Sequence, residues 1–149
     1  MKQQERQKKS KEKILQAAIT EFSASGYDKV TMENICTRHG ISKGMMYHYY
    51  SGKDDLFLLC VQNMYQMMQQ YLEENMAELE KKDALHALKE FWMLRESFFG
   101  EHPPFKNIFE NALLRTPPHL FEKIEEIRGP IEALNRQFLH RTIGKIELR

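Results

Sequence analysis

The chain has 149 residues, of which 42% are hydrophobic and 29% are charged, and its formal net charge at pH 7 is +1. A chain of this length with few glycines and prolines is expected to fold around a real core rather than remain disordered. The longest apolar run, residues 56–61, is far shorter than the roughly 18 residues of a membrane helix, and the charged N-terminus leads into no signal segment, so we expect a cytoplasmic protein without a membrane partner.

Hydrophobic residues recur at helical spacing along nearly the whole chain, which predicts an all-α protein. We expect Ser10 to cap the first helix and Gly26 to end it after about four turns. The apolar face of this helix consists of Ile14, Leu15, Ala18, Ile19 and Phe22.

A short helix, a tight turn and a third helix are expected next. Thr31 is expected to cap the second helix, which Gly40 ends after about two turns, and Ser42 is expected to cap the third. The turn at residues 39–41 contains a glycine that can adopt positive φ and an apolar residue, Ile41, that can face inward. This arrangement predicts a helix-turn-helix.

A long fourth helix, beginning at Ser51 or Gly52, is expected to join the N-terminal helices to the rest of the chain. Three further helices are expected at residues 83–99, 105–114 and 118–143. The pair Gly129-Pro130 is expected to kink or split the last of them. We therefore predict a helix-turn-helix domain at residues 1–52 and a helical regulatory domain at residues 53–149.

The charge is distributed unevenly. Up to Lys53 there are ten basic and five acidic residues, so this part carries +5 and leaves −4 of the total +1 to the remainder. A basic N-terminal part favours a polyanionic partner, although a lysine-rich terminus can also serve only solubility. Together with a helix-turn-helix, it indicates binding to double-stranded DNA.

The third predicted helix has the side chains that a helix in the major groove needs. Helical spacing places Lys43, Met45, Tyr47 and His48 on one broad side, and Gly44 lets the backbone approach the duplex. Met46 and Tyr50 are then expected to pack inward. Two other residues, Thr31 and Lys53, lie at helix N-termini, where free N–H groups and the helix dipole favour a phosphate.

Many of these positions together resemble the TetR family over about residues 10–57. The matching positions are Ile14-Leu15, Ala17-Ala18, Phe22, Gly26-Tyr27, Thr31, Ile35, Gly40-Ile41-Ser42-Lys43-Gly44, Tyr47, Lys53 and Leu56. The resemblance implies that the first three helices bind operator DNA. It also implies that helices four to seven enclose an inducer pocket whose filling moves the fourth helix and spreads the DNA-binding heads of a dimer.

Carried over by position, the resemblance assigns Thr31, Ser42, Tyr47 and Lys53 to phosphate contacts and Lys43, Gly44, Met45 and His48 to the base-facing surface. Met45 departs from the family pattern, in which a small hydroxyl residue is common, and Tyr50 stands where Phe is usual. Other interpretations remain open: Tyr47 as a core aromatic, His48 and the two lysines as plain surface residues, and the two hydroxyl residues as helix caps only.

The second half is rich in large, adaptable apolar side chains. Such residues can line a cavity for a small apolar or amphipathic inducer, or they can form an ordinary packed core. The candidate ligand-binding residues are Tyr65, Met68, Phe91, Trp92, Phe98, His102, Phe105 and Phe109. The composition does not identify the ligand.

The chain ends earlier than is usual for the family, whose members add two more helices that pair with a second subunit. It is therefore expected to be either a fragment or a short member that forms a homodimer through other surfaces. We predict a DNA-binding transcriptional regulator, namely a repressor that a ligand releases from its operator. The alternative is a short interaction protein that modulates a full-length regulator by pairing with it.

An enzymatic function is not expected. The cysteines Cys36 and Cys60 lack a neighbouring metal-ligand partner and are predicted to be reduced and buried. A single Asp83-x-x-His86 is the nearest approach to a metal-binding helix motif, and neither a nucleophile elbow nor a phosphate loop occurs. We therefore predict neither a metal nor another cofactor.

Overall fold

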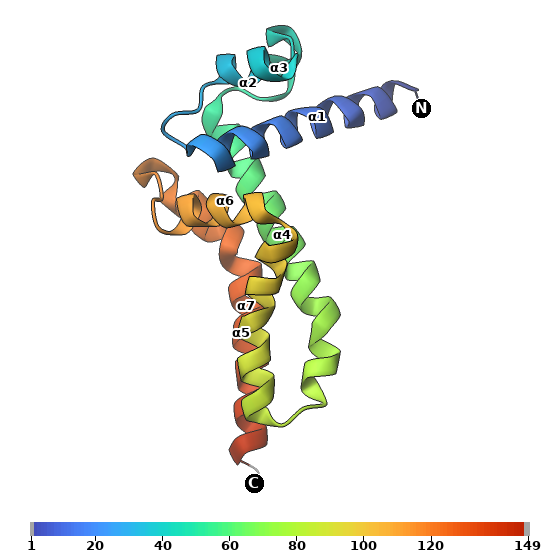
Figure 1. Cartoon of the computed structure of the whole chain (residues 1–149), viewed down its shortest axis with the longest axis vertical. Coiled ribbons are helices and arrows are strands. Elements are labelled where there is room, and N and C mark those ends of the chain that lie inside the picture. Colours follow the sequence, from blue (N-terminus) through green and yellow to red (C-terminus); the bar gives the residue numbers. More distant parts are fainter. Residues whose placement is uncertain (1, 148–149) are drawn as a thin grey trace.

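All regular elements in the computed structural model, which describes residues 2–147, are helical, as predicted. They are α1 (Lys2–Ser25), α2 (Met32–His39), α3 (Lys43–Tyr49), α4 (Lys53–Glu80), α5 (Ala84–Glu101), α6 (Pro103–Leu113), the short 3-10 helix η1 (Pro118–Leu120) and α7 (Phe121–Glu147). Helices α4, α5 and α7 form a long bundle, and α1 to α3 lie at one end of it (Figure 1). None of the helices in residues 2–147 is long and apolar enough to cross a membrane.

The helix-turn-helix is present, with the expected caps. The Thr31 hydroxyl accepts a hydrogen bond from the Asn34 N–H at 3.0 Å, and the Ser42 hydroxyl accepts one from the Met45 N–H at 3.1 Å. Gly40 adopts the left-handed conformation with φ 62°, which turns the chain so that Ile41 is buried. These contacts fix the direction in which α3 leaves the turn.

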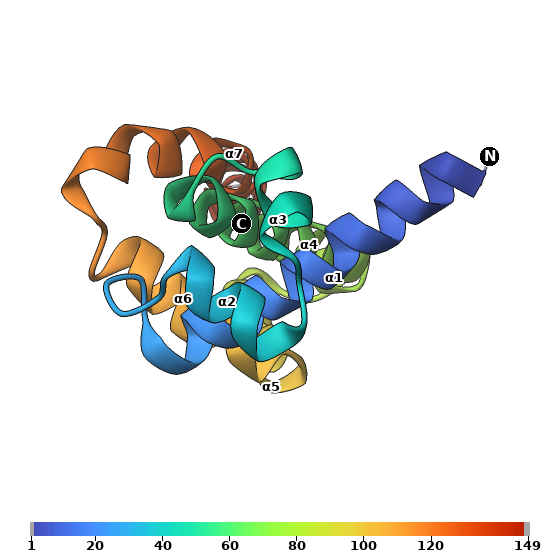
Figure 2. The ribbon, with the colours of Figure 1, turned by 90° about the horizontal axis from the view of Figure 1, so that it is seen from above.

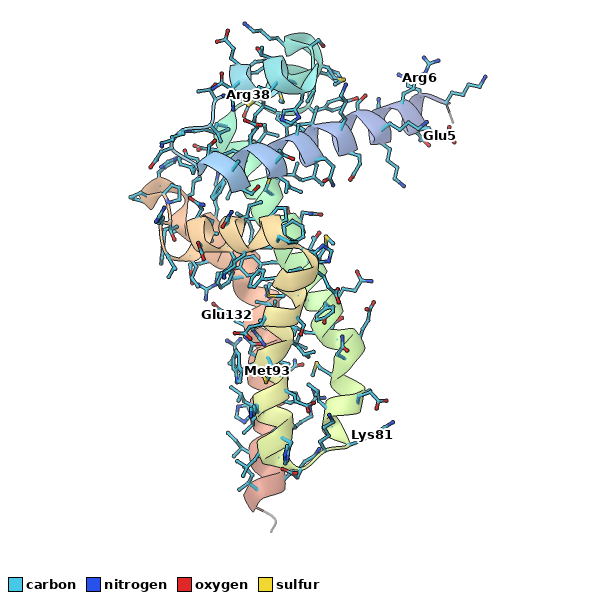
Figure 3. All side chains as sticks on the ribbon, in the orientation of Figure 1. Glu5, Arg6, Arg38, Lys81, Met93 and Glu132 are labelled. Carbon is cyan, nitrogen blue, oxygen red and sulfur yellow. The ribbon has the colours of Figure 1, made fainter. Side chains whose placement is uncertain are left out.

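Helix α1 is longer than predicted, because it begins at Lys2 and not at Ser10. Residues 2–9 are Lys, Gln, Glu and Arg, straight-chain residues that lose little side-chain freedom in a helix, so the helix continues past the single serine. This first part of α1 is exposed and extends away from the body, with Glu5 and Arg6 near its far end (Figure 3). Residues 2–9 carry a net charge of +3, out of the net +5 up to Lys53.

The hydrophobic core is continuous from the N-terminal helices into the bundle. Phe22 of α1 meets Phe57 of α4 edge-on at 5.2 Å between ring centroids. Helix α1 also lies along α6, where the Asn107 amide donates to the Ser23 carbonyl at 2.9 Å, and Figures 1 and 2 show the two helices side by side. The division at residue 52 stays a prediction, since the two proposed domains share this core.

The last two helical segments differ from the prediction in detail. Helix α6 begins at Pro103, where proline suits the first turn. Residues 118–120 form η1, and α7 then passes through Gly129-Pro130 without being split. Proline removes one backbone hydrogen bond, but the buried side chains of Ile124 and Ile131 hold the helix against the bundle on both sides of it.

Candidate nucleic-acid interface and internal pocket

Helix α3 presents a largely exposed face to solvent. Lys43, Gly44, Tyr47 and His48 are exposed, and the Tyr47 side chain is 53% accessible, so it is not a core aromatic. No heavy atom lies within 4 Å of a Cβ built on Gly44, which leaves the backbone open to close approach. Contact of this face with a DNA groove stays a prediction.

Two of the neighbouring methionine and tyrosine residues face the core. Met46 is fully buried, which confirms the prediction for it, and Tyr50 is half-buried at the end of α3. Met45, predicted to face the bases, is only half-exposed because part of its side chain packs against the core. Burial also raises the pKa of the Tyr50 hydroxyl.

The hydroxyls of Thr31 and Ser42 are exposed and already serve as helix caps. Capping uses each hydroxyl oxygen as an acceptor, so the O–H donor remains available for a phosphate oxygen. The capping role is therefore observed, and the phosphate contact stays a prediction.

A buried carboxylate, which the sequence analysis missed, attaches α2 to α1. Glu21 accepts hydrogen bonds from Arg38 Nη1 at 2.6 Å and His39 Nε2 at 2.9 Å. The hydrogen bond from His39, followed by the bond and charge of Arg38, holds the pKa of Glu21 below its ordinary value against the opposing effect of burial. A glutamate beside Phe22, on the apolar face of α1, was the available signal for this cluster.

Lys53 lies at the start of α4 as predicted, but it also has partners within the chain. Its ammonium donates to the Tyr27 carbonyl at 2.9 Å and lies 4.1 Å from the centre of the Tyr27 ring. The contact ties α4 to the segment between α1 and α2. A phosphate contact by Lys53 stays a prediction.

Next to Lys53, three polar side chains join the N-terminal helices, α4 and η1. The Tyr27 hydroxyl donates to Asp54, and His119 Nε2 lies 2.9 Å from the other Asp54 oxygen. Burial and the Asp54 carboxylate raise the pKa of Tyr27 to about 12. Burial alone would raise the pKa of Asp54, but the bonds from Tyr27 and His119 outweigh it and lower that pKa. We call Tyr27, Lys53, Asp54 and His119 the head junction.

A cavity of about 230 Å³, partly open to solvent beside Trp92, lies between α4, α5, α6 and α7, and we call it the internal pocket. Four of the eight predicted ligand residues line it, namely Tyr65, Met68, Trp92 and Phe109. The structure does not bring the other four to this pocket. Phe91 is fully buried and stacks on Phe138 at 4.0 Å.

The remaining three predicted ligand residues, Phe98, His102 and Phe105, form an aromatic cluster elsewhere. The rings of Phe98 and Phe105 are stacked at 5.9 Å, and His102 lies 5.0 Å from Phe98. His102 and Phe105 also line an open hollow of about 380 Å³ beside α1. The eight predicted ligand residues therefore do not form one site, because helical periodicity does not specify which residues of different helices come together.

Polar groups also line the internal pocket, among them Arg95, which the sequence analysis did not select. Arg95 donates to the Phe91 carbonyl at 2.9 Å and to the Asn135 side chain, and its guanidinium lies 4.2 Å from the Trp92 ring. Burial lowers the pKa of Arg95 to about 10. Burial is also the main cause that raises the pKa of Tyr65 to about 12.

These features define a protein of the helix-turn-helix class, with an exposed third helix and a separate pocket in a helical body. The family described as bacterial regulatory proteins, tetR family, matches residues 14–60. The HTH-type regulator YvdT of Bacillus subtilis is 31% identical over 144 residues, which cover 92% of this chain and 69% of YvdT. The chain belongs to the TetR family.

Other relatives agree. The biofilm operon negative regulator IcaR of Staphylococcus epidermidis is 32% identical over 76 residues, 51% of this chain and 41% of IcaR, and RutR of Escherichia coli is 27% identical over 124 residues, 83% of this chain and 56% of RutR. The chain therefore spans about half of the length of IcaR and of RutR.

Solved structures share the fold. A TetR-family regulator from Syntrophomonas wolfei matches with a TM-score of 0.73 and 17% identity, over 93% of this chain and 70% of the other. The fatty acid degradation regulator FadR of Bacillus halodurans matches with a TM-score of 0.71 and 18% identity, over 89% and 67% of the two chains. At these identities the likeness concerns the fold alone.

Proposed function

We propose that this protein is a DNA-binding transcriptional regulator, a repressor whose affinity for its operator falls when a small ligand fills the internal pocket. The observation that carries the DNA-binding part is the exposed face of α3, presented by a capped helix-turn-helix. The curated relatives are transcriptional regulators rather than enzymes, and IcaR is named as a negative regulator.

Two routes connect the internal pocket to the N-terminal helices. Phe109 of α6 lines the pocket, while Asn107 on the same helix holds α1 through the Ser23 carbonyl. Tyr65 of α4 lines the pocket, and the first turn of α4 carries the head junction. A ligand that prefers a different spacing of these helices therefore changes the position of α3, with a coupling of about 1 to 3 kcal/mol expected for allosteric proteins.

A palindromic operator needs two copies of α3 held about one helical turn of DNA apart. We therefore propose that the regulator acts as a homodimer. Sedimentation of the protein with and without operator DNA tests this, and a complex of one chain per duplex would contradict it.

The DNA-binding part is tested by fluorescence anisotropy on a duplex from the gene's own upstream region and on a scrambled duplex of equal length. Lys43→Ala should weaken operator binding about tenfold and reduce the salt dependence by about one counterion. Lys81→Ala is the matched control, because it removes the same charge from an exposed position at the C-terminal end of α4, far from α3 (Figure 3).

A preference for the native duplex that persists at physiological salt, and that only the Lys43 variant loses, supports the proposal. Equal binding to both duplexes, or equal effects of the two variants, would contradict it, because charge alone would then explain the binding.

A further inference from the structure

Tyr65, which lines the internal pocket, has a buried hydroxyl donor without a partner. Tyr65 is 4% exposed, and its hydroxyl is the buried side-chain polar atom in residues 2–147 that forms no hydrogen bond. Buried polar groups in folded proteins are nearly always paired, and each exception requires an explanation, such as a bound water, an ion or a functional role. A bound ligand with an oxygen acceptor would supply the missing partner.

Arg95 of α5, which also lines the pocket, has a positive charge without a carboxylate partner. Its guanidinium has five N–H donors, of which it uses two on the Phe91 carbonyl and the Asn135 amide, both uncharged. Among the described residues, no carboxylate forms an ion pair with Arg95, although burial already disfavours its charged form. An anion in the pocket would compensate this charge.

The second arginine of the pocket differs in this respect. Arg128 of α7 forms ion pairs with Glu125 at 2.6 Å and at 3.0 Å with Glu132, which lines the pocket as well, so its charge is already balanced. Arg95 is therefore the arginine of the pocket whose charge no carboxylate balances.

The remaining walls select the shape of the ligand. Trp92, Phe99 and Phe109 present aromatic surfaces from α5 and α6. A volume of about 230 Å³ is below the range of drug-sized pockets, so it fits a ligand of roughly ten heavy atoms. Aromatic walls and a small volume favour a single flat ring.

We propose that the internal pocket binds a small aromatic monocarboxylate, whose carboxylate accepts hydrogen bonds from Arg95 and whose oxygen atoms also satisfy the Tyr65 hydroxyl. This inference rests on the proposed function for its regulatory consequence, since the ligand is the inducer of that function. The binding itself is independent of DNA and can be measured without it.

Isothermal titration calorimetry on the full chain without DNA tests the proposal, with benzoate and phenylacetate as probes. The matched controls are benzamide and phenylacetamide, which keep the ring and the size but have no charge. At least one carboxylate should bind with a Kd below about 1 mM, and its amide should bind about 10- to 100-fold more weakly, as expected for the loss of a charge-assisted hydrogen bond.

Three variants identify the groups responsible. Tyr65→Phe removes only the hydroxyl and should weaken carboxylate binding about 2- to 10-fold. Arg95→Met should abolish the preference for the carboxylate over the amide, whereas Arg95→Lys should retain the preference at lower affinity. Circular dichroism shows which variants fold, and the Tyr65 variant decides the question if the Arg95 variants do not.

Binding of a carboxylate that Tyr65→Phe weakens supports the proposal, whatever the DNA titration shows. It is overturned if neither carboxylate binds, if the amides bind as tightly, or if Tyr65→Phe binds as the parent does. Failure of operator binding with intact carboxylate binding would contradict the proposed function instead.

Discussion

Replacing Tyr65 by Phe should stabilise the unliganded protein, contrary to the usual effect of a buried substitution. The change removes one buried oxygen that forms no hydrogen bond and leaves the aromatic ring in place. Burying an unpaired hydroxyl costs about 1 to 3 kcal/mol. The packing lost with one oxygen amounts to a few tenths of a kcal/mol. The free energy of unfolding should therefore rise by about 1 kcal/mol.

Two other tyrosines provide matched controls for the same chemical change. Tyr27→Phe removes a hydroxyl that donates to Asp54 and should lower the free energy of unfolding by about 1 kcal/mol. Tyr47→Phe removes a hydroxyl from a largely exposed side chain and should change it by less than about 0.5 kcal/mol.

Urea unfolding followed by circular dichroism measures all three variants, and thermal unfolding should show an increase in Tm of about 2 to 4 °C for Tyr65→Phe. A loss of stability for Tyr65→Phe comparable to that of Tyr27→Phe would refute the reasoning. The Tyr65 hydroxyl would then be satisfied in the free protein and would not need an acceptor from a ligand.

Two further substitutions test a buried polar cluster and a buried aromatic contact. Glu21→Gln should lower the free energy of unfolding by about 1 to 3 kcal/mol, because Arg38 and His39 lose a charged acceptor. The pKa of Glu21 is lowered in the folded state, so the contribution of Glu21 to stability is present above the ordinary glutamate pKa and disappears as the pH falls through the pKa of the folded state. The urea midpoints of the variant and the parent should therefore converge as the pH is lowered from neutral to acidic. Phe91→Ala should lower the free energy of unfolding by about 3 to 5 kcal/mol, because it removes a fully buried ring stacked on Phe138. A fall in Tm smaller than that of Phe91→Leu would contradict this.

Short-range signals in the sequence predicted the helix-turn-helix because each one acts within a few residues. The caps at Thr31 and Ser42 and the left-handed Gly40 depend on contacts three to five positions apart. The predicted start of α1 was wrong, because one serine at position 10 does not end a helix that good helix formers continue on its N-terminal side. Local rules therefore locate the elements well and their ends less well.

The internal pocket could be predicted only in part, because its lining depends on how four helices are rotated relative to one another. The abundance of large apolar side chains suggested eight candidate residues, of which Tyr65, Met68, Trp92 and Phe109 line this cavity. It could not separate them from Phe91, which faces the core. Arg95 was missed because a charged residue on a helix normally indicates the solvent side. Its partner Asn135 lies 40 residues away, beyond the reach of a local sequence pattern.

The two connections between the pocket and the N-terminal helices differ in chemistry, and this difference separates them experimentally. The head junction contains charged groups, and its Asp54 and His119 side chains are 43% and 55% exposed, so salt screens its contribution. The contact between α6 and α1 consists of apolar packing and the neutral bond from Asn107 to Ser23, which salt affects little. If ligand-induced release is measured as the ratio of operator affinities with and without ligand, a ratio that stays constant from low to high salt assigns the coupling to α6. A ratio that falls with salt in the parent, and is already low in Asp54→Asn, assigns it to the head junction.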